Sequence, residues 1–285
     1  MRQDPVRRHP VFASLAGIGL LAVLTSLQAS DSPALDKAAH ASLVQAVAAP
    51  QRSEANRARD QYRHPVETLS FIGVKPTDTV VELWPGGGWY TEILAPYLAD
   101  HGRLIAAAPA GKGAESMAKR LDANPALYGK VERANFPTVL GGTGVAAGTA
   151  DVVLTFRNVH NWKTGYLQAE KTDYSEAAFR EIYSMLKPGG VLGIEDHRLP
   201  EAASAEREGG SGYIKVSTVR AMAEKAGFEF AGSSEVNANP KDTTDWPEGV
   251  WTLPPSFELG DKDRAKYAAI GESDRMTLRF VKPKR

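Results

Sequence analysis

The stretch TVVELWPGGGWY, residues 79–90, joins a short apolar run to a cluster of glycines. The run TVVEL is typical of a buried strand. Glycine permits tight turns and lets the backbone approach a ligand closely. Beyond the turn, Trp89, Ile93 and Tyr97 fall on one face of a helix over residues 89–100. The stretch therefore predicts a strand, a glycine turn and a helix whose first N–H groups are unpaired.

The same alternation of strand and helix continues along the chain. Helices are predicted over 51–71, with an interruption at Pro65, and over 113–123, 175–186 and 217–226. Strands are predicted over 103–108, near 131, and over 151–156, 191–196, 228–236 and 276–281. Such an order indicates a parallel sheet with helices on both faces. Right-handed crossovers then place the carboxyl ends of the strands at one edge, where ligands bind.

Composition excludes several classes of protein. The chain has 285 residues, with 34 Lys and Arg against 34 Asp and Glu, and no cysteine. The balanced charge argues against a nucleic-acid-binding protein. The lack of cysteine excludes disulfides, thiolate metal sites and Cys nucleophiles. Composition predicts no oligomeric state.

The N-terminal residues have the layout of a secretory signal. Arg2, Arg7 and Arg8 precede an uncharged stretch over 11–30 that ends in small residues. We therefore expect a signal peptide over 1–29, cleavage after Ala29, a periplasmic or secreted protein, and no stable membrane insertion afterwards. An uncleaved anchor is the alternative, although the apolar run is short for a bilayer span. Residues 30–50 are expected to form a flexible tether, followed by one domain over 51–285 with an irregular insert at 237–274.

Four motifs carry a resemblance to a known superfamily: VVEL with PGGG at 80–88, RNVH at 157–160, LKPGG at 186–190 and AGF at 226–228. Together they resemble the class I S-adenosylmethionine-dependent methyltransferases, and also a family of exported "predicted methyltransferases". The resemblance covers roughly residues 51–283. It implies a Rossmann-like α/β fold with a seven-stranded, mostly parallel sheet, an antiparallel last strand and helices on both faces.

The resemblance also implies S-adenosylmethionine as cofactor, with its methionine moiety beside the glycine turn. The residues expected to bind it are Glu82, Trp84, Pro85, Gly86, Gly87, Gly88, Arg157 and Asn158. Two features depart from the superfamily's pattern. Trp84 stands where a glycine is usual, and the second strand ends in Ala108 and Pro109 instead of the acid that usually binds the ribose.

Polar residues follow the fourth and fifth predicted strands. His160 and His197 could act as general bases, with Asp196 as the orienting carboxylate, which makes these three the expected catalytic residues. Ordinary hydrogen-bonded loop histidines and a metal site are the alternatives. The residues expected to contact substrate are Tyr90, Arg157, Trp162 and Arg275, with Arg157 anchoring a negative group.

Tryptophans cluster in the loops at the expected ligand edge. Trp84 and Trp89 are expected to wall a pocket, whereas Trp246 and Trp251 are expected to form a small core within the insert. The sequence thus predicts an exported methyltransferase acting on a small substrate. The alternative is a cofactor-free protein of the same fold, serving as a binding protein or as a metal-dependent, hydrolase-like enzyme.

Overall fold

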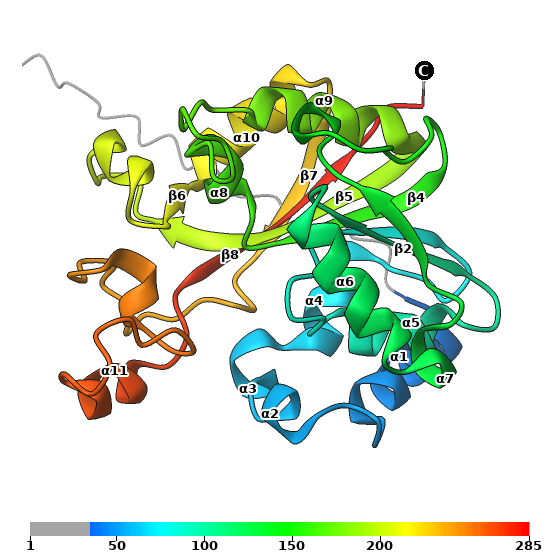
Figure 1. Cartoon of the computed structure of the whole chain (residues 1–285), viewed down its shortest axis with the longest axis horizontal. Helices are drawn as coiled ribbons and strands as arrows, with labels where there is room; N and C mark the ends of the chain where they lie inside the picture. Colours follow the sequence, from blue (N-terminus) through cyan, green and yellow to red (C-terminus); the bar gives the residue numbers. More distant parts are fainter. Residues whose placement is uncertain (1–34, 285) are drawn as a thin grey trace, which may run out of the picture.

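The computed structural model describes residues 35–284, which form one sheet with helices on both faces (Figure 1). The predicted signal peptide lies outside the described residues. The strands are β1 (Thr79–Leu83), β2 (Arg103–Ala108), β3 (Glu132–Asn135), β4 (Ala150–Phe156), β5 (Leu186–Leu199), β6 (Ile214–Lys215), β7 (Glu229–Ser234) and β8 (Arg275–Val281). The helices are α1 (Lys37–Ala48), α2 (Glu54–Arg57), α3 (Asp60–Arg63), α4 (Pro65–Ile72), α5 (Thr91–Leu98), α6 (Lys112–Asp122), α7 (Pro125–Tyr128), α8 (Val159–Lys163), α9 (Ser175–Met185), α10 (Val216–Lys225) and α11 (Arg264–Ile270).

The strand order confirms the predicted fold class. The main sheet runs β3-β2-β1-β4-β5-β8-β7, and the pairs from β3 to β5 are all parallel. The last strand, β8, is antiparallel to both of its neighbours. An eighth strand, β6, pairs only with the end of β5 through Arg198 and Ile214, and was not predicted.

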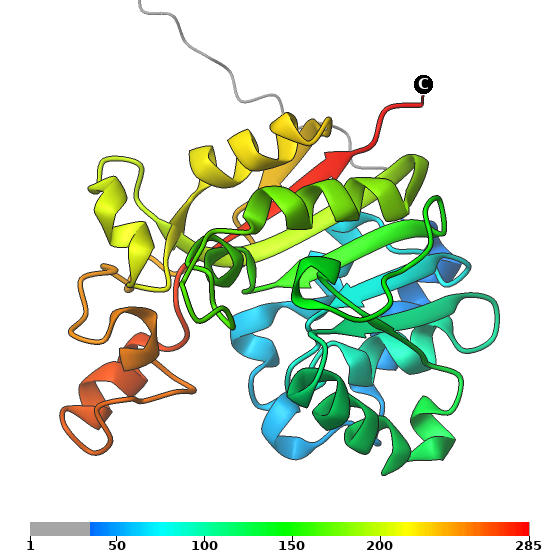
Figure 2. The same cartoon turned by 45° about the horizontal axis from the view of Figure 1, so that its top comes forward.

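Each face of the sheet has its own core, which explains the two layers of helices (Figure 2). On one face, Phe179 and Ile182 of α9 pack with Val219 of α10. On the other face, α1, α4 and α5 contribute Leu43, Ile72 and Ile93. Strands covered on both faces are mostly apolar, and β1 is buried at every position, with Glu82 as its one charged residue.

The predicted tether over 30–50 is wrong from Lys37 onward. Residues 37–48 form α1, and the Asp36 side chain caps it by accepting a hydrogen bond of 2.8 Å from the amide of Ala39. Ala39, Leu43 and Ala46 lie on one helical face and are buried against the sheet side that carries α4 and α5. The folded domain therefore includes this helix and does not begin at residue 51.

The fifth strand is longer than predicted. The predicted strand covers 191–196, but β5 begins at Leu186, directly after α9, and so includes the LKPGG stretch. Gly189 and Gly190 are paired with Lys282 by backbone hydrogen bonds of 2.8 and 2.9 Å. These bonds to the end of the β8 strand draw the turn into the sheet.

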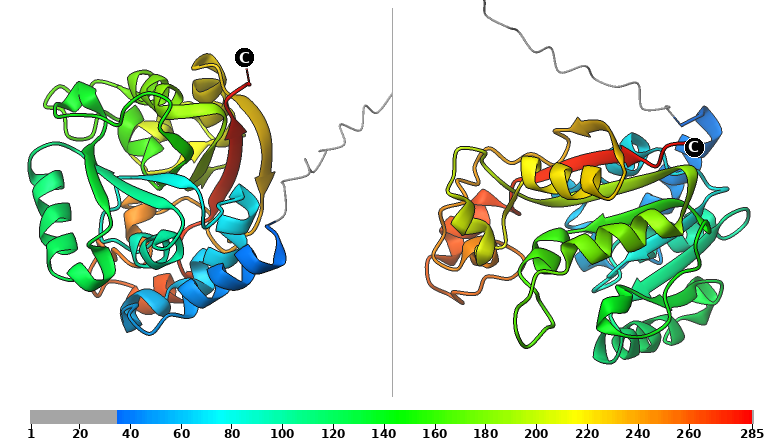
Figure 3. Two further views of the ribbon diagram at one scale, coloured as in Figure 1. Left: turned by 90° about the vertical axis from the view of Figure 1, so that its right-hand side faces the viewer. Right: turned by 90° about the horizontal axis from the view of Figure 1, so that it is seen from above.

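The irregular insert over 237–274 lies beyond the carboxyl end of β5, beside β6 (Figures 1 and 3). Trp246 packs against the small cluster of Leu199, Tyr213 and Val250, so its core is shared with residues outside the insert and does not lie within it as predicted. Within residues 35–284, no helix is both long and apolar enough to cross a bilayer. The insert instead forms one wall of the site described next.

Candidate functional site

A cavity of about 300 Å³ lies at the carboxyl ends of β1, β4 and β5. This is the edge where the topology of an open α/β sheet places ligands. Its walls come from the glycine turn, α2 and α3, the residues after β4, the end of β5 and the insert. The lining residues are Asn56, Arg59, Arg63, Glu82, Trp84, Pro85, Gly86, Gly87, Trp89, Tyr90, Phe156, Arg157, Asn158, His160, Asn161, His197, Val250, Trp251, Pro254, Pro255 and Ser256.

The glycine turn leaves room for a ligand at one position in particular. A Cβ atom added to Gly87 would meet no heavy atom within 4 Å, and Gly87 lines the cavity. Gly88 has a φ of +77°, and a Cβ there would lie 2.8 Å from Cδ of Arg120. Nη1 of Arg120 donates to the Gly87 carbonyl at 2.6 Å, so this side chain holds the turn from outside the cavity lining.

Trp84 adopts the left-handed backbone that a glycine would adopt easily, with a φ of +49°. Its indole Nε1 donates to the carbonyl of Phe136 at 2.8 Å. Its ring is nearly perpendicular to that of Trp162, with the two ring centroids 6.2 Å apart. Because Phe136 directly follows β3, the indole extends from the end of β1 towards the end of β3. The bulky residue is thus held as a wall of the cavity, as predicted.

Glu82, one residue before the end of β1, is buried and lines the cavity. Burial raises the pKa of Glu82 to about 7, although the hydrogen bond from Thr91 Oγ1, at 2.7 Å, opposes the shift. A buried acid of this kind gains most from a cationic partner, such as an ammonium group. The carboxyl group is therefore suited to bind a positively charged part of a ligand.

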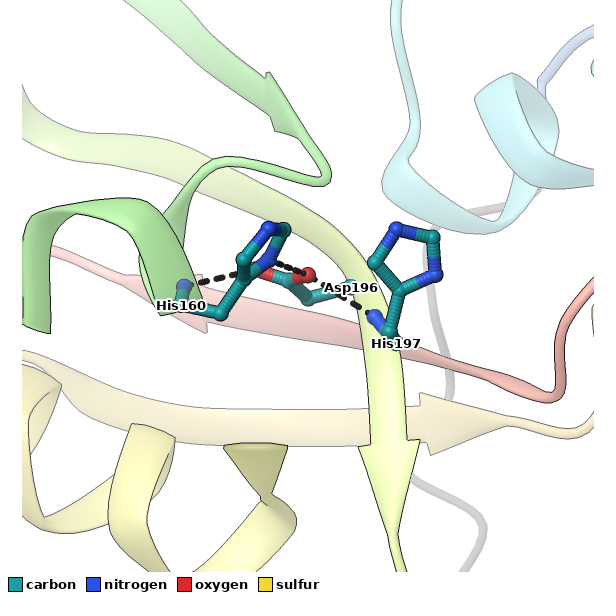
Figure 4. A group of neighbouring side chains, drawn as sticks. All are labelled: His160, Asp196 and His197. Atoms are coloured by element: carbon teal, nitrogen blue, oxygen red, sulfur yellow. Dashed lines mark hydrogen bonds and ion pairs between the residues drawn. The ribbon is translucent and has the colours of Figure 1, made fainter. Parts of the chain in front are cut away.

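His160 and Asp196 form a buried pair (Figure 4). Nδ1 of His160 lies 2.7 Å from Oδ1 of Asp196, and the same carboxylate accepts hydrogen bonds from the backbone amides of His160 and His197 at 3.2 and 2.8 Å. Because a carboxylate oxygen is an acceptor, Nδ1 of His160 is the donor and Nε2 is left as an acceptor. Nε2 is turned away from Asp196, and His160 lines the cavity.

His197 lies beside this pair, with its ring centroid 5.2 Å from that of His160. Burial lowers the pKa of His197 well below its ordinary value, and the nearby His160 and Arg157 lower it further. Nδ1 of His197 lies 2.6 Å from Oγ of Ser273. His197 is therefore a neutral imidazole held in a fixed orientation.

The side chains of His160, Asp196 and His197 also offer ligand atoms within 4.8 Å of one another. However, the three hydrogen bonds accepted by Asp196 already occupy both of its oxygens. This arrangement is that of a carboxylate orienting a histidine.

The structure brings together most of the residues predicted for the site. Arg157, His160 and His197 line the same cavity, as expected from their places after β4 and at the end of β5. The residues of the predicted cofactor and substrate groups that also line it are Glu82, Trp84, Pro85, Gly86, Gly87, Tyr90 and Asn158. Gly88 and Asp196 lie behind this lining, next to residues that form it.

The prediction that Trp162 and Arg275 contact the substrate is wrong. Trp162 is fully buried and packs against Phe136 and Phe179 in the core, with ring centroids 5.3 and 6.1 Å away. Arg275 is 1% exposed and forms ion pairs of 3.0 Å with Glu195 and Glu272. Both side chains are therefore structural and do not line the cavity.

Sequence reasoning also missed part of the site. Trp251 was assigned to the core of the insert, but it lines the cavity with its ring centroid 6.4 Å from that of His160. Asn56, Arg59 and Arg63 come from α2, α3 and the turn between them, and no role was predicted for them. The spacing of four between Arg59 and Arg63, one helical turn, was the only local signal.

The cavity fits one end of S-adenosylmethionine better than the other. Glu82 could bind the ammonium group of its amino-acid end, and the open side of Gly87 leaves space for the backbone to approach it. Among the described residues that line the cavity, none comes from the end of β2, and Glu82 carries the only carboxylate. The ribose hydroxyls would therefore lack the acidic partner usual in the superfamily.

Neither a protein-family profile nor a curated protein sequence matches the chain. Solved structures do. An S-adenosylmethionine-dependent methyltransferase from Aquifex aeolicus superposes with a TM-score of 0.52 at 14% identity, over 79% of this chain and 93% of that one. A putative sarcosine dimethylglycine methyltransferase from Galdieria sulphuraria superposes with a TM-score of 0.53 at 12% identity, over 82% of this chain and 89% of that one. This is the class I methyltransferase fold. The [4+2]-cyclase SpnF also superposes, with a TM-score of 0.53 at 15% identity, over 85% of this chain and 91% of that one. At these identities the likeness concerns the methyltransferase fold, which itself hosts more than one reaction.

Proposed function

We propose that this protein is an S-adenosylmethionine-dependent methyltransferase that acts on a small molecule. One observation carries the proposal: a single cavity joins the glycine turn and Glu82 to the oriented imidazole of His160. The glycine turn and Glu82 could bind the amino-acid end of the cofactor, and His160 could bind the methyl acceptor. The methyltransferase fold of the described residues supports the assignment.

The proposed chemistry divides between the cofactor and the chain. S-adenosylmethionine supplies an electrophilic methyl group, so the protein has to align the acceptor and take up its proton. Nε2 of His160 is the acceptor for that proton, and Asp196 stabilises the imidazolium that results. Tyr90, which stacks on Phe156 with ring centroids 3.5 Å apart, provides a flat wall of the cavity.

A second candidate is a binding protein or enzyme that has the methyltransferase fold without the cofactor. Two observations favour it. The indole of Trp84 is hydrogen-bonded in place between the ends of β1 and β3, and β2 ends without an acid. Hydrogen bonds to charged groups are worth about 1.5–3 kcal/mol each, so the missing acid would weaken cofactor binding considerably.

Calorimetric titration of S-adenosylmethionine and S-adenosylhomocysteine into the purified protein separates these candidates. Gly87→Val places a branched side chain in open space on the cavity wall, so it should abolish cofactor binding with little change in melting temperature. Gly209→Val is the matched control, because a Cβ there also meets no atom within 4 Å and Gly209 lies outside the cavity. Wild-type protein that gives no heat with either ligand at millimolar concentration would favour the cofactor-free candidate.

We also propose that the protein is exported from the cytosol. The basic residues Arg2, Arg7 and Arg8, followed by the uncharged stretch over 11–30, support this location. Export would require S-adenosylmethionine to reach the protein outside the compartment that makes it, which makes the titration above the first experiment to perform.

A further inference from the structure

Three arginines line the cavity next to the histidines: Arg59, Arg63 and Arg157. Two of them share a carboxylate, since Nε of Arg59 and Nε of Arg63 donate to Glu272 at 2.6 and 3.0 Å. The remaining nitrogens of these guanidinium groups are the notable feature. Nη2 of Arg59 and both Nη atoms of Arg63 are buried without a hydrogen-bond partner among the described residues.

Arg63 is the most constrained of the three. It is 1% exposed, and its guanidinium carbon lies 4.8 Å from the centroid of the Trp89 ring. Stacking on an aromatic ring satisfies the flat face of a guanidinium, whereas its N–H groups point outward in the plane and require acceptors. Burial lowers the pKa of Arg63 to about 9, and the neighbouring Arg157 contributes to the shift. A buried cation in this state would be stabilised by an anion.

Arg157 is held by its backbone alone. Its amide donates to the Glu195 carbonyl at 2.6 Å, and its φ of +63° turns the chain sharply after β4. Within residues 35–284, its guanidinium forms neither a hydrogen bond nor an ion pair, although burial lowers its pKa. All five N–H donors of this side chain remain available to a ligand.

The charges of the cluster do not balance. The guanidinium groups of Arg59, Arg63, Arg157 and Arg275 are accompanied by two carboxylates, those of Glu195 and Glu272. Asp196, a fully buried carboxylate beside the histidines, offsets one more charge. The positive charge that remains lies in a largely buried region, where uncompensated charge is costly. An anionic ligand would compensate it and accept the unpaired N–H groups.

The electrostatics place this surplus near the histidines. Glu272, which pairs with Arg59 and Arg63, directly precedes Ser273, whose Oγ lies 2.6 Å from Nδ1 of His197. Arg157 and Arg63 also lower the pKa of His197. An anion bound by the cluster would therefore lie on the acceptor side of the cavity. Glu82 and the glycine turn, where the proposed cofactor binds, meet this cluster at Trp89, on which Arg63 stacks.

We propose that Arg59, Arg63 and Arg157 bind the oxyanion of an acidic substrate, either a carboxylate or a phosphate. Planar guanidinium groups suit both, since they donate two parallel hydrogen bonds to such oxygens. The inference rests on the proposed function, because it names the class of methyl acceptor. The cavity volume of about 300 Å³ restricts that acceptor to a small molecule.

Calorimetric titration with inorganic phosphate and with acetate tests the site without any cofactor. Wild-type protein should bind at least one of them, and Arg157→Gln should weaken that binding by about 10–100-fold, the equivalent of one charged hydrogen bond. Arg157→Gln should fold normally because the guanidinium has no protein partner, and Arg157→Lys should restore part of the affinity. Arg133→Gln is the control, since Arg133 is exposed and pairs with Asp122 away from the cavity.

A second titration distinguishes the substrate's anion from the carboxylate of the cofactor. The anion should bind with equal affinity to the free protein and to protein saturated with S-adenosylhomocysteine. Displacement of the anion by S-adenosylhomocysteine would overturn the inference and leave the proposed function intact. Absence of phosphate and acetate binding, or equal binding by wild type and Arg157→Gln, would also overturn it. If S-adenosylhomocysteine itself fails to bind, the proposed function fails, while the Arg157 comparison still decides the anion site.

Discussion

Removing the charge of Glu272 should destabilise the protein in a way that depends on pH. This carboxylate is 4% exposed and forms ion pairs with Arg59, Arg63 and Arg275 at 2.6, 3.0 and 3.0 Å. Solvent screens such a pair far less than a surface pair. Burial alone would raise the pKa of Glu272, but Arg275, Arg63 and Arg59 together lower it from 4.5 to about 2.

The magnitude follows from this difference in pKa. At 1.36 kcal/mol per pH unit, the drop from 4.5 to about 2 corresponds to about 3 kcal/mol of stability. Because the pKa is lower in the folded state, this contribution is present above pH 4.5 and is lost as the pH falls through about 2. The neutral variant Glu272→Gln should therefore be about 3 kcal/mol less stable than wild type at neutral pH. This difference in the free energy of unfolding should shrink towards zero as the pH falls to about 2.

Urea unfolding of wild type and Glu272→Gln across this pH range, followed by circular dichroism, measures the gap directly. Other titrating groups act in both proteins and cancel in the difference. Glu115→Gln makes the same chemical change at an exposed position of α6 and should leave the free energy of unfolding unchanged within about 0.5 kcal/mol. Curves for wild type and Glu272→Gln that stay parallel from neutral pH to pH 3 would refute the reasoning.

Three further predictions test the core, the proposed base and the location. Trp162→Ala should lower the free energy of unfolding in urea by about 3–5 kcal/mol, since the side chain is fully buried, and should leave S-adenosylhomocysteine affinity unchanged in the folded fraction. An affinity change without a stability change would restore Trp162 as a ligand contact. Asp196→Asn should lower turnover of the acceptor by about 10²–10⁴-fold, because the amide cannot orient and stabilise His160 in the same way. Equal turnover by wild type and variant would remove His160 as the base. Mass spectrometry of protein from the native host should find an N-terminus near Ser30, and a retained Met1 or Arg2 in soluble cytosolic material would contradict export.

Much of the fold could be predicted from the sequence because its signals are local. Short, mostly apolar runs mark β1 and β2, and the observed bounds match the predicted ranges 79–83 and 103–108. The glycines after β1 and the polar residues after β4 and β5 then follow from topology, since parallel strands bring their carboxyl ends together. The same reasoning placed Arg157, His160 and His197 in one cavity.

Local pattern failed where a residue's environment depends on distant chain. Trp84, Trp162 and Trp251 all follow predicted strands or lie in the insert, and no local pattern separates their roles. Trp84 forms a wall of the cavity between strand ends, Trp162 is buried in the core, and Trp251 reaches the cavity from the insert. An indole can serve in all three places, because its apolar area and its single N–H suit a core as well as a pocket. The Ala-rich segment of α1 is similar, since only packing against α4 and α5 makes its apolar face useful.

The anion site is the clearest product of the tertiary structure. Arg63 and Glu272 are 209 residues apart, and Arg59 and Arg63 line the same cavity as His197 only because the chain before β1 folds over the carboxyl ends of later strands. Of the three arginines, the sequence predicts an anion contact only for Arg157, at a strand end, whereas Arg59 and Arg63 read as ordinary surface charges. Burial decides otherwise: removing several guanidinium groups from water, with too few carboxylates beside them, creates a demand for an anion that no local stretch of sequence displays.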